Sequence, residues 1–256
     1  MNFQKTSNPT LGEGIIKDYA FAATDKAMTV QGTISKIALL LALVVAGAVF
    51  TWAKVMGGIE TGELVGIRGW MIGGSVAAFV LAMIIVFKKN LAPILSPVYA
   101  ICEGLCLGAL SAYFQNVFPG VVLHAVLLTF SVLFGMLFMY KVQIIKVTQR
   151  FRAIVMAATV GIAFAYLISF ILNLFGVNMG FIFGADSLGL GLIISLVIVA
   201  VAALNLVLDF DFIEKGTEAG LPSFFEWYGA FGLMVTLIWL YIEILRLLAT
   251  IASNRN

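Results

Sequence analysis

Residues 188–208 read LGLGLIISLVIVAVAALNLVL, and this stretch holds no charged residue before Asp209. A transmembrane α-helix needs about 20 consecutive, mostly apolar residues, because the hydrocarbon core of a bilayer is about 30 Å thick. An uncharged run of this length is typical of a membrane span and not of a soluble helix. The stretch therefore predicts a membrane-spanning helix.

Six more runs of this kind occur in the chain. They begin near residues 36, 70, 94, 121, 153 and 228. The composition agrees, since the chain is 62% hydrophobic and 11% charged, whereas a soluble domain is about half apolar and about a quarter charged. We predict an all-α polytopic membrane protein, with an N-terminal arm over residues 1–34 and a seven-helix transmembrane domain over residues 35–256.

The basic residues divide unequally between the two sides of such a domain. Eleven lie on the side of the amino terminus, namely Lys5, Lys17, Lys26, Lys36, Lys88, Lys89, Lys141, Lys146, Arg150, Arg152 and Lys215. Four lie on the opposite side, namely Lys54, Arg68, Arg246 and Arg255. Because Lys and Arg concentrate in cytoplasmic loops, we predict a cytoplasmic arm and a carboxyl terminus on the opposite side of the membrane.

Glycine recurs inside the runs, where it allows two helices to approach closely. The residues concerned are Gly73, Gly74, Gly104, Gly108, Gly135, Gly161, Gly189 and Gly191. We expect these glycines to serve helix packing.

One carboxylate interrupts the third run. Glu103 lies in VYAICEGLCLGALSAYF, residues 98–114, about two turns after Pro97. An ionisable side chain at membrane depth is costly unless it is paired, neutral or hydrated, so it marks a candidate functional site. The alternative is a protonated carboxyl group that hydrogen-bonds a neighbouring helix, and the residues leave both readings open.

Three carboxylates close the sixth run, in LNLVLDFDFIEKG at residues 204–216. At about 100° per residue, Asp209 points away from Asp211, which shares a helix face with Glu214. The carboxyl end of a helix repels anions, so these side chains need a cation, a proton or solvent. We expect Asp209 to be functional, and solvation is a better alternative for Asp211 and Glu214 than for Asp209. Asp211 stays a further candidate for the ion pathway, as do Glu103, Glu226, Thr236 and Glu243.

The last run, EWYGAFGLMVTLIWLYIEILRLL at residues 226–248, carries three more polar candidates. Thr236 and Glu243 are seven residues apart and share a helix face. Arg246 follows Glu243 by one turn, so a Glu243–Arg246 ion pair is the structural alternative to a functional Glu243. Glu226 precedes two aromatic residues that suit the membrane interface, where it faces headgroups or the mouth of a pore.

The sequence lacks the common motifs of enzymes and of metal sites. The chain has no glycine-rich phosphate-binding loop, no GxSxG stretch and no cluster of metal ligands, and His124 is its one histidine. We therefore expect neither an enzyme nor a bound cofactor, and nothing in the charge pattern indicates nucleic acid as a partner.

The motifs quoted above resemble those of one family. The segments at 204–216 and 227–248, together with EGLCLGALSAYF at 103–114 and YKVQIIKVTQRFR at 140–152, are similar to the Bax inhibitor-1 family, also called transmembrane Bax inhibitor motif or YccA-like proteins. The likeness covers all seven runs and is to the bacterial branch with an extended N-terminal arm. It implies a bacterial plasma (inner) membrane protein whose last helix is central in the bundle.

The resemblance also implies a function. Some bacterial members are pH-sensitive calcium leaks in which two aspartates, one ending the sixth helix and one in the last, share a proton and latch the pore. Asp209 matches the first position, but Thr236 stands at the second. Two close carboxylates share a proton because they cannot both ionise, so this chain needs another partner for Asp209. Glu103, Glu226 and Glu243 are candidates, with Glu103 the first choice by estimated depth.

Three functions remain open from the sequence. The leading one is a pH-sensitive Ca²⁺ leak channel gated by membrane-embedded carboxylates, in which Asp209 and Glu103 offer oxygen ligands to Ca²⁺ in passage. The second is a membrane interaction protein that modulates another membrane protein, such as a quality-control protease, through its arm and residues 141–152. The third is a proton-coupled transporter of a small solute that uses Glu103 or Glu243 as proton carrier.

Overall fold

The computed structural model describes residues 26–61, 67–176 and 190–253. This part of the chain forms seven α-helices and one short 3₁₀ helix. They are α2 (Val30–Thr61), α3 (Ile67–Phe87), η2 (Lys89–Leu91), α4 (Ala92–Val117), α5 (Val121–Lys141), α6 (Gln149–Leu174), α8 (Leu190–Glu218) and α9 (Phe224–Ser253). Seven helices are long and apolar enough to cross a membrane, which confirms the predicted all-α polytopic fold.

The first helix begins earlier than the predicted end of the arm. Val30, not residue 35, opens α2. Thr29 explains the boundary, because its Oγ1 accepts a hydrogen bond from the Gly32 amide at 2.9 Å and so caps the helix. Most of the predicted arm, residues 1–25, lies outside the described residues.

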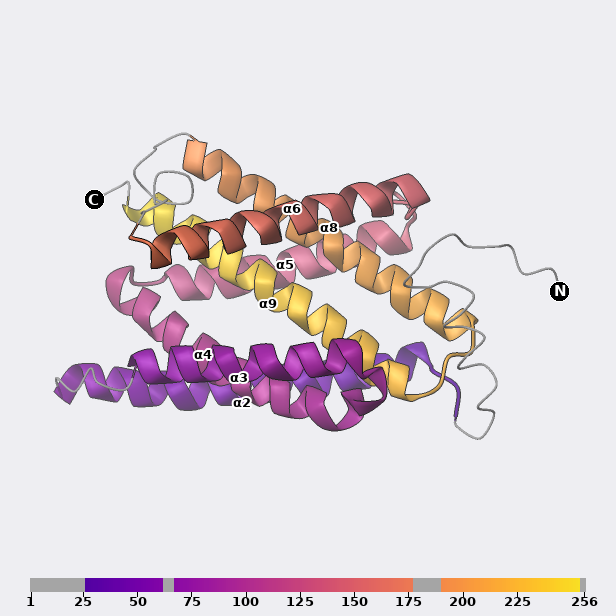
Figure 1. Cartoon of the computed structure of the whole chain (residues 1–256), viewed down its shortest axis with the longest axis horizontal. Coiled ribbons are helices and arrows are strands. Elements are labelled where there is room, and N and C mark those ends of the chain that lie inside the picture. Colours follow the sequence, from indigo (N-terminus) through magenta and orange to yellow (C-terminus); the bar gives the residue numbers. More distant parts are fainter. Residues whose placement is uncertain (1–25, 62–66, 177–189, 254–256) are drawn as a thin grey trace.

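The last helix occupies the middle of the bundle. α9 runs diagonally between the layer of α2, α3 and α4 and the group of α5, α6 and α8 (Figure 1). It packs against α2, α4, α5 and α8, and it is the most buried of the described spans. Its residues enter two core clusters, Leu233 and Leu240 with α5 and α8, and Met234 and Ile238 with α2, α3 and α4. The prediction of a central last helix is confirmed.

Glycines set the closest helix contact, between α2 and α4. A Cβ built on Gly104 would lie 2.3 Å from the Val44 carbonyl oxygen, and one on Gly108 would lie 2.2 Å from that of Ala48. Gly74 packs similarly against α4, since its added Cβ would be 2.9 Å from the Cys102 carbonyl oxygen. The packing role predicted for these glycines is therefore confirmed.

Other glycines of the runs do not close a helix contact. A Cβ built on Gly73, Gly135 or Gly161 would meet no atom within 4 Å. These positions face outward, so the packing prediction is wrong for them. Gly189 lies outside the described residues.

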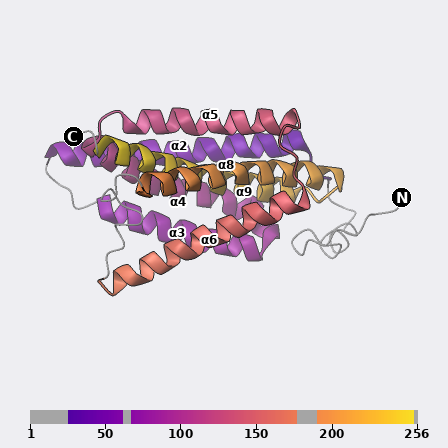
Figure 2. The same cartoon turned by 90° about the horizontal axis from the view of Figure 1, so that it is seen from above.

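α6 lies at the edge of the bundle. It packs against α8 and diverges from the other helices in the second view (Figure 2). Large apolar side chains such as Val160 and Phe164 are more than half exposed there. In a membrane protein this face contacts lipid.

Candidate functional site

Asp209 lies on α8 where that helix packs against α9. The Thr236 side chain of α9 is within hydrogen-bonding reach of its carboxyl group. One turn earlier, a Cβ built on Gly232 would lie 3.8 Å from Asp209 Oδ1. Asp209 Oδ2 is buried and has no hydrogen-bond partner within the described residues. Such a carboxyl group needs a proton, water or a cation, because an unpartnered buried charge is strongly disfavoured.

Thr236 has a second contact on its own helix. Its Oγ1 donates a hydrogen bond to the Gly232 carbonyl at 3.2 Å. A hydroxyl carries one hydrogen but also accepts hydrogen bonds. The Thr236 hydroxyl can therefore accept a hydrogen bond from a neutral Asp209 carboxyl group while it donates to the Gly232 carbonyl. When Asp209 is ionised, the same hydroxyl can donate its hydrogen to the carboxylate instead.

Glu103 lies on α4 and is half-buried. Its carboxyl group is close enough to Tyr99 and Cys106 of the same helix to act on them electrostatically, and Cys106 hydrogen-bonds Ser75 of α3. Neither a hydrogen bond nor an ion pair joins Glu103 to Asp209 in the part of the chain that the structure describes. The polar group beside Asp209 is Thr236, and the Glu103–Asp209 partnership stays a prediction.

Asp211 is buried, with 5% of its surface exposed. Arg152, from the first turn of α6, donates a hydrogen bond to Asp211 Oδ2. Lys215 of α8 lies 2.8 Å from Oδ1. The prediction of a solvated Asp211 is wrong, because α6 carries a guanidinium over this face of α8. Glu214 is exposed, as predicted, and accepts a hydrogen bond from the Tyr140 hydroxyl of α5.

Glu226 is buried at the start of α9 instead of facing headgroups. Its Oε1 accepts hydrogen bonds from the Thr29 amide at 2.9 Å and the Thr29 hydroxyl at 2.8 Å. Its Oε2 pairs with Lys36 Nζ at 2.6 Å. A Cβ built on Gly32 would lie 2.1 Å from Oε1, so any larger residue there would displace the Glu226 carboxylate. Glu226 thus ties the start of α9 to the start of α2.

Glu243 is buried in the half of α9 nearer its carboxyl end. It forms an ion pair with Arg246. Its Oε1 also accepts hydrogen bonds from the Tyr166 hydroxyl of α6 at 2.7 Å and from Trp239 Nε1 at 3.2 Å. The structural alternative anticipated for this residue is present, and it joins α6 to α9.

The carboxylates of the membrane region therefore fall into two groups. Asp211, Glu226 and Glu243 each have a basic partner. Asp209 and Glu103 have none among the described residues. No three Asp, Glu, His or Cys side chains converge as metal ligands in the part of the chain that the structure describes.

These features belong to a chain whose sequence matches one family model over nearly its full length. The model described as Bax inhibitor 1 like matches residues 8–253. The chain belongs to this family. No match was found among the curated proteins or among the solved structures.

Family membership confirms the resemblance that the segments 204–216 and 227–248 carry. It also allows the contact between α8 and α9 to be compared with the two-aspartate latch that the resemblance implies. In this Bax inhibitor 1 like protein, the α9 residue that faces Asp209 is Thr236, which carries a hydroxyl and not a carboxyl group. This contact thus holds one titratable group, whereas a proton-sharing pair needs two.

Sequence reasoning anticipated Arg246 as the partner of Glu243, but it did not identify the basic partners of Glu226 and Asp211. Lys36 and Glu226 are separated by 190 residues, and Arg152 and Asp211 by 59. A signal for these pairs was present, because all four residues lie near helix ends on the same predicted side of the membrane. The shared side of the membrane limits the possible basic partners of each acid, but it does not select one of them.

Proposed function

We propose that this protein is a pH-sensitive cation leak channel that passes Ca²⁺, with Asp209 as its gating group. The observation that supports this proposal is the Asp209 carboxyl group, which is buried at the α8–α9 contact with Oδ2 unpartnered in the described chain. In the neutral form it is tolerated at membrane depth. In the ionised form it draws water or a cation into the contact.

Thr236, at the position where the resemblance implies a second aspartate, can take part in gating through its hydroxyl. Its hydroxyl can accept from the neutral Asp209 carboxyl while donating to the Gly232 carbonyl, and it can donate to the ionised carboxylate. The contact between α8 and α9 therefore accommodates both protonation states without a second carboxylate. Gating then follows a single proton.

Ion pairs and hydrogen bonds of other acids attach α8 and α9 to their neighbouring helices. Glu226 joins the start of α9 to α2, and Glu243 joins its other half to α6. Asp211 joins the end of α8 to α6. We expect these contacts to confine any opening to the Asp209 region, because they tie α8 and α9 to α2 and α6.

The sign of the pH dependence follows from the ligand chemistry. Ca²⁺ binds ionised carboxylate oxygens, and protonation removes that affinity. Flux should therefore rise with pH. Asp209→Asn keeps the shape of a neutral carboxyl group but cannot ionise, so it should lower flux about tenfold at the alkaline end and abolish the pH dependence, since hydrogen bonds to a charged group contribute about 1.5–3 kcal/mol.

The test is Ca²⁺ entry into liposomes that contain the purified protein, over a pH series from about 5 to about 8. Glu103→Gln asks whether the second unpaired carboxylate contributes. Glu218→Gln, at the exposed end of α8, is the matched control and should behave as the wild type. A pH-dependent flux that is unchanged in Asp209→Asn would rule out Asp209 as the gate.

A second candidate, an interaction protein that modulates another membrane protein, is favoured by the segment between α5 and α6. Val142 and Ile144 are 53% and 64% exposed beside Lys141. Exposed apolar residues rimmed by polar ones can mark a site that contacts a protein or a membrane. If flux is absent from every folded sample, replacement of Val142 and Ile144 by Ser should abolish the effect on the partner protein, whereas Ser at Val160 of α6 should not.

A further inference from the structure

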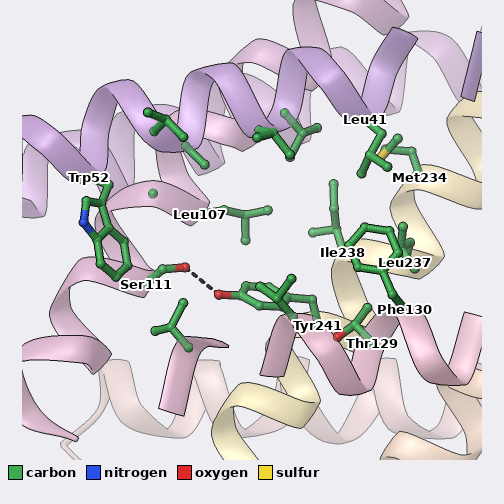
Figure 3. Close-up of a pocket in the computed structure, with 17 residues that line it drawn as sticks. Leu41, Trp52, Leu107, Ser111, Thr129, Phe130, Met234, Leu237, Ile238 and Tyr241 are labelled. Carbon is green, nitrogen blue, oxygen red and sulfur yellow. Dashed lines mark hydrogen bonds between the residues drawn. The ribbon is translucent and has the colours of Figure 1, made fainter. Parts of the chain in front are cut away.

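A lateral cavity of about 410 Å³ opens between α2 and α5. Its floor is formed by α4 and α9 (Figure 3). Val45 and Val49 of α2 lie at its rim, and they are 50% and 62% exposed. The cavity therefore opens toward the membrane and not into the core of the bundle.

Small and β-branched side chains form part of the walls of the cavity. α2 and α5 each pack against α9, and between them the lining includes Val44, Ala48, Gly108, Val122 and Val126. Gly108 and Ala48 are also the residues that bring α4 and α2 into backbone contact. The close α2–α4 contact thus leaves α2 away from α5.

The lining is unsuited to water. Thr129 is one of its few polar residues, and its hydroxyl already donates to the Ala125 carbonyl at 2.7 Å. A buried water needs two to four polar partners, whereas apolar cavities stay dry and bind apolar ligands. An alkyl chain is the chemistry that fits these walls.

One end of the cavity carries a hydrogen-bond donor. Ser111 Oγ and Tyr241 Oη are 2.6 Å apart and face each other across the cavity floor (Figure 3). The two hydroxyls hold two hydrogens, and their mutual bond uses one of them. The structure gives the second hydrogen no acceptor within the described residues. A ligand that brings an acceptor oxygen to this end would complete the pair.

The donor lies toward the end of the bundle where α4 terminates. Ser111 lies six residues before the end of α4 at Val117, or about 9 Å along the helix axis. Trp52 lines the same end of the cavity, and tryptophan is enriched at the membrane interface. Leu41 and Met234 line the other end, away from Trp52 and Ser111 (Figure 3).

We propose that this cavity binds one acyl chain of an ester-linked glycerophospholipid. The lipid belongs to the leaflet at the end of the bundle where α4 and α9 terminate. Its chain extends from Trp52 toward Met234, and its ester carbonyl accepts the spare hydrogen of the Ser111–Tyr241 pair. The site is separate from Asp209 and does not depend on the proposed channel function.

The test uses a phospholipid with a diazirine near the end of one acyl chain, reconstituted with the full-length protein and activated by light. Peptide mapping should place the label on residues around Met234 and Leu41. Val126→Trp fills the cavity and should reduce that label at least several-fold. Val160→Trp, on the exposed face of α6, is the matched control and should leave it unchanged.

The donor is tested with an ester-linked and an ether-linked lipid that carry the same photoreactive chain. The wild type should label several-fold more with the ester, because an ether offers no carbonyl oxygen. The double variant Ser111→Ala, Tyr241→Phe should label equally with both, and it keeps the cavity open if Val126→Trp fails to assemble. Label spread evenly over exposed faces such as that of α6, or no ester preference in the wild type, would overturn the proposal.

Discussion

At the scale of single residues, some acids of the membrane region have a basic partner and others have none among the described residues. Glu226 is saturated by Thr29 and Lys36, and Asp211 lies against Arg152 and Lys215. Asp209 instead leaves one buried oxygen unpartnered in the described chain. The sequence shows where each acid lies, but it does not show whether a base from another helix reaches it.

Replacing Thr236 by Asp tests the single-proton gate. Two close carboxylates lose their protons in two macroscopic steps, because the first charge opposes the second. We expect the flux of Thr236→Asp to follow pH in two steps and that of the wild type in one. Thr236→Ser keeps the hydroxyl and should preserve the single step. A single step in all three proteins would show that residue 236 does not act on Asp209.

At the scale of elements, helix contacts depend on which face each glycine occupies. Gly104 and Gly135 are both glycines within apolar helices, but one touches the backbone of α2 and the other meets nothing within 4 Å. Neither the local sequence nor helix propensity distinguishes them. The difference arises from the rotation of α4 and α5 about their axes, which tertiary packing sets.

Gly104→Ala should therefore destabilise the protein and Gly135→Ala should not. The added methyl at 104 would lie 2.3 Å from the Val44 carbonyl oxygen, so α2 must move. Overpacking of this kind costs about 1–3 kcal/mol. Thermal unfolding in detergent, followed by circular dichroism, should show a lower midpoint for Gly104→Ala alone. Equal midpoints for the two variants would contradict the α2–α4 contact.

At the scale of the whole molecule, the described helices run alternately between two ends of the bundle (Figure 1). The segment between α5 and α6 lies at one end, and the carboxyl end of α6 at Leu174, which Phe175 follows, lies at the other. The charge distribution predicts that the first of these is cytoplasmic. The orientation in the membrane stays a prediction, and it is measurable with single cysteines.

Ile144→Cys and Phe175→Cys, in a background with Cys102 and Cys106 replaced by Ala, test this orientation. Both native side chains are exposed, at 64% and 78%. In bacterial spheroplasts that express the protein, which have an intact inner membrane but no outer membrane, a membrane-impermeant maleimide should label the cysteine at 175. The cysteine at 144 should react only after the membrane is permeabilised. The reverse pattern would place the arm outside the cytoplasm.

The sequence by itself determined the helical membrane fold, the seven spans and the family. A bilayer requires an uninterrupted apolar length, and a helix satisfies its backbone within that length, so both signals are local. Only the tertiary structure decided that Lys36 reaches Glu226, that Arg152 covers Asp211, and that a cavity separates α2 from α5. These features depend on the rotation and crossing of helices distant in the chain, which apolar runs of nearly uniform composition do not encode locally.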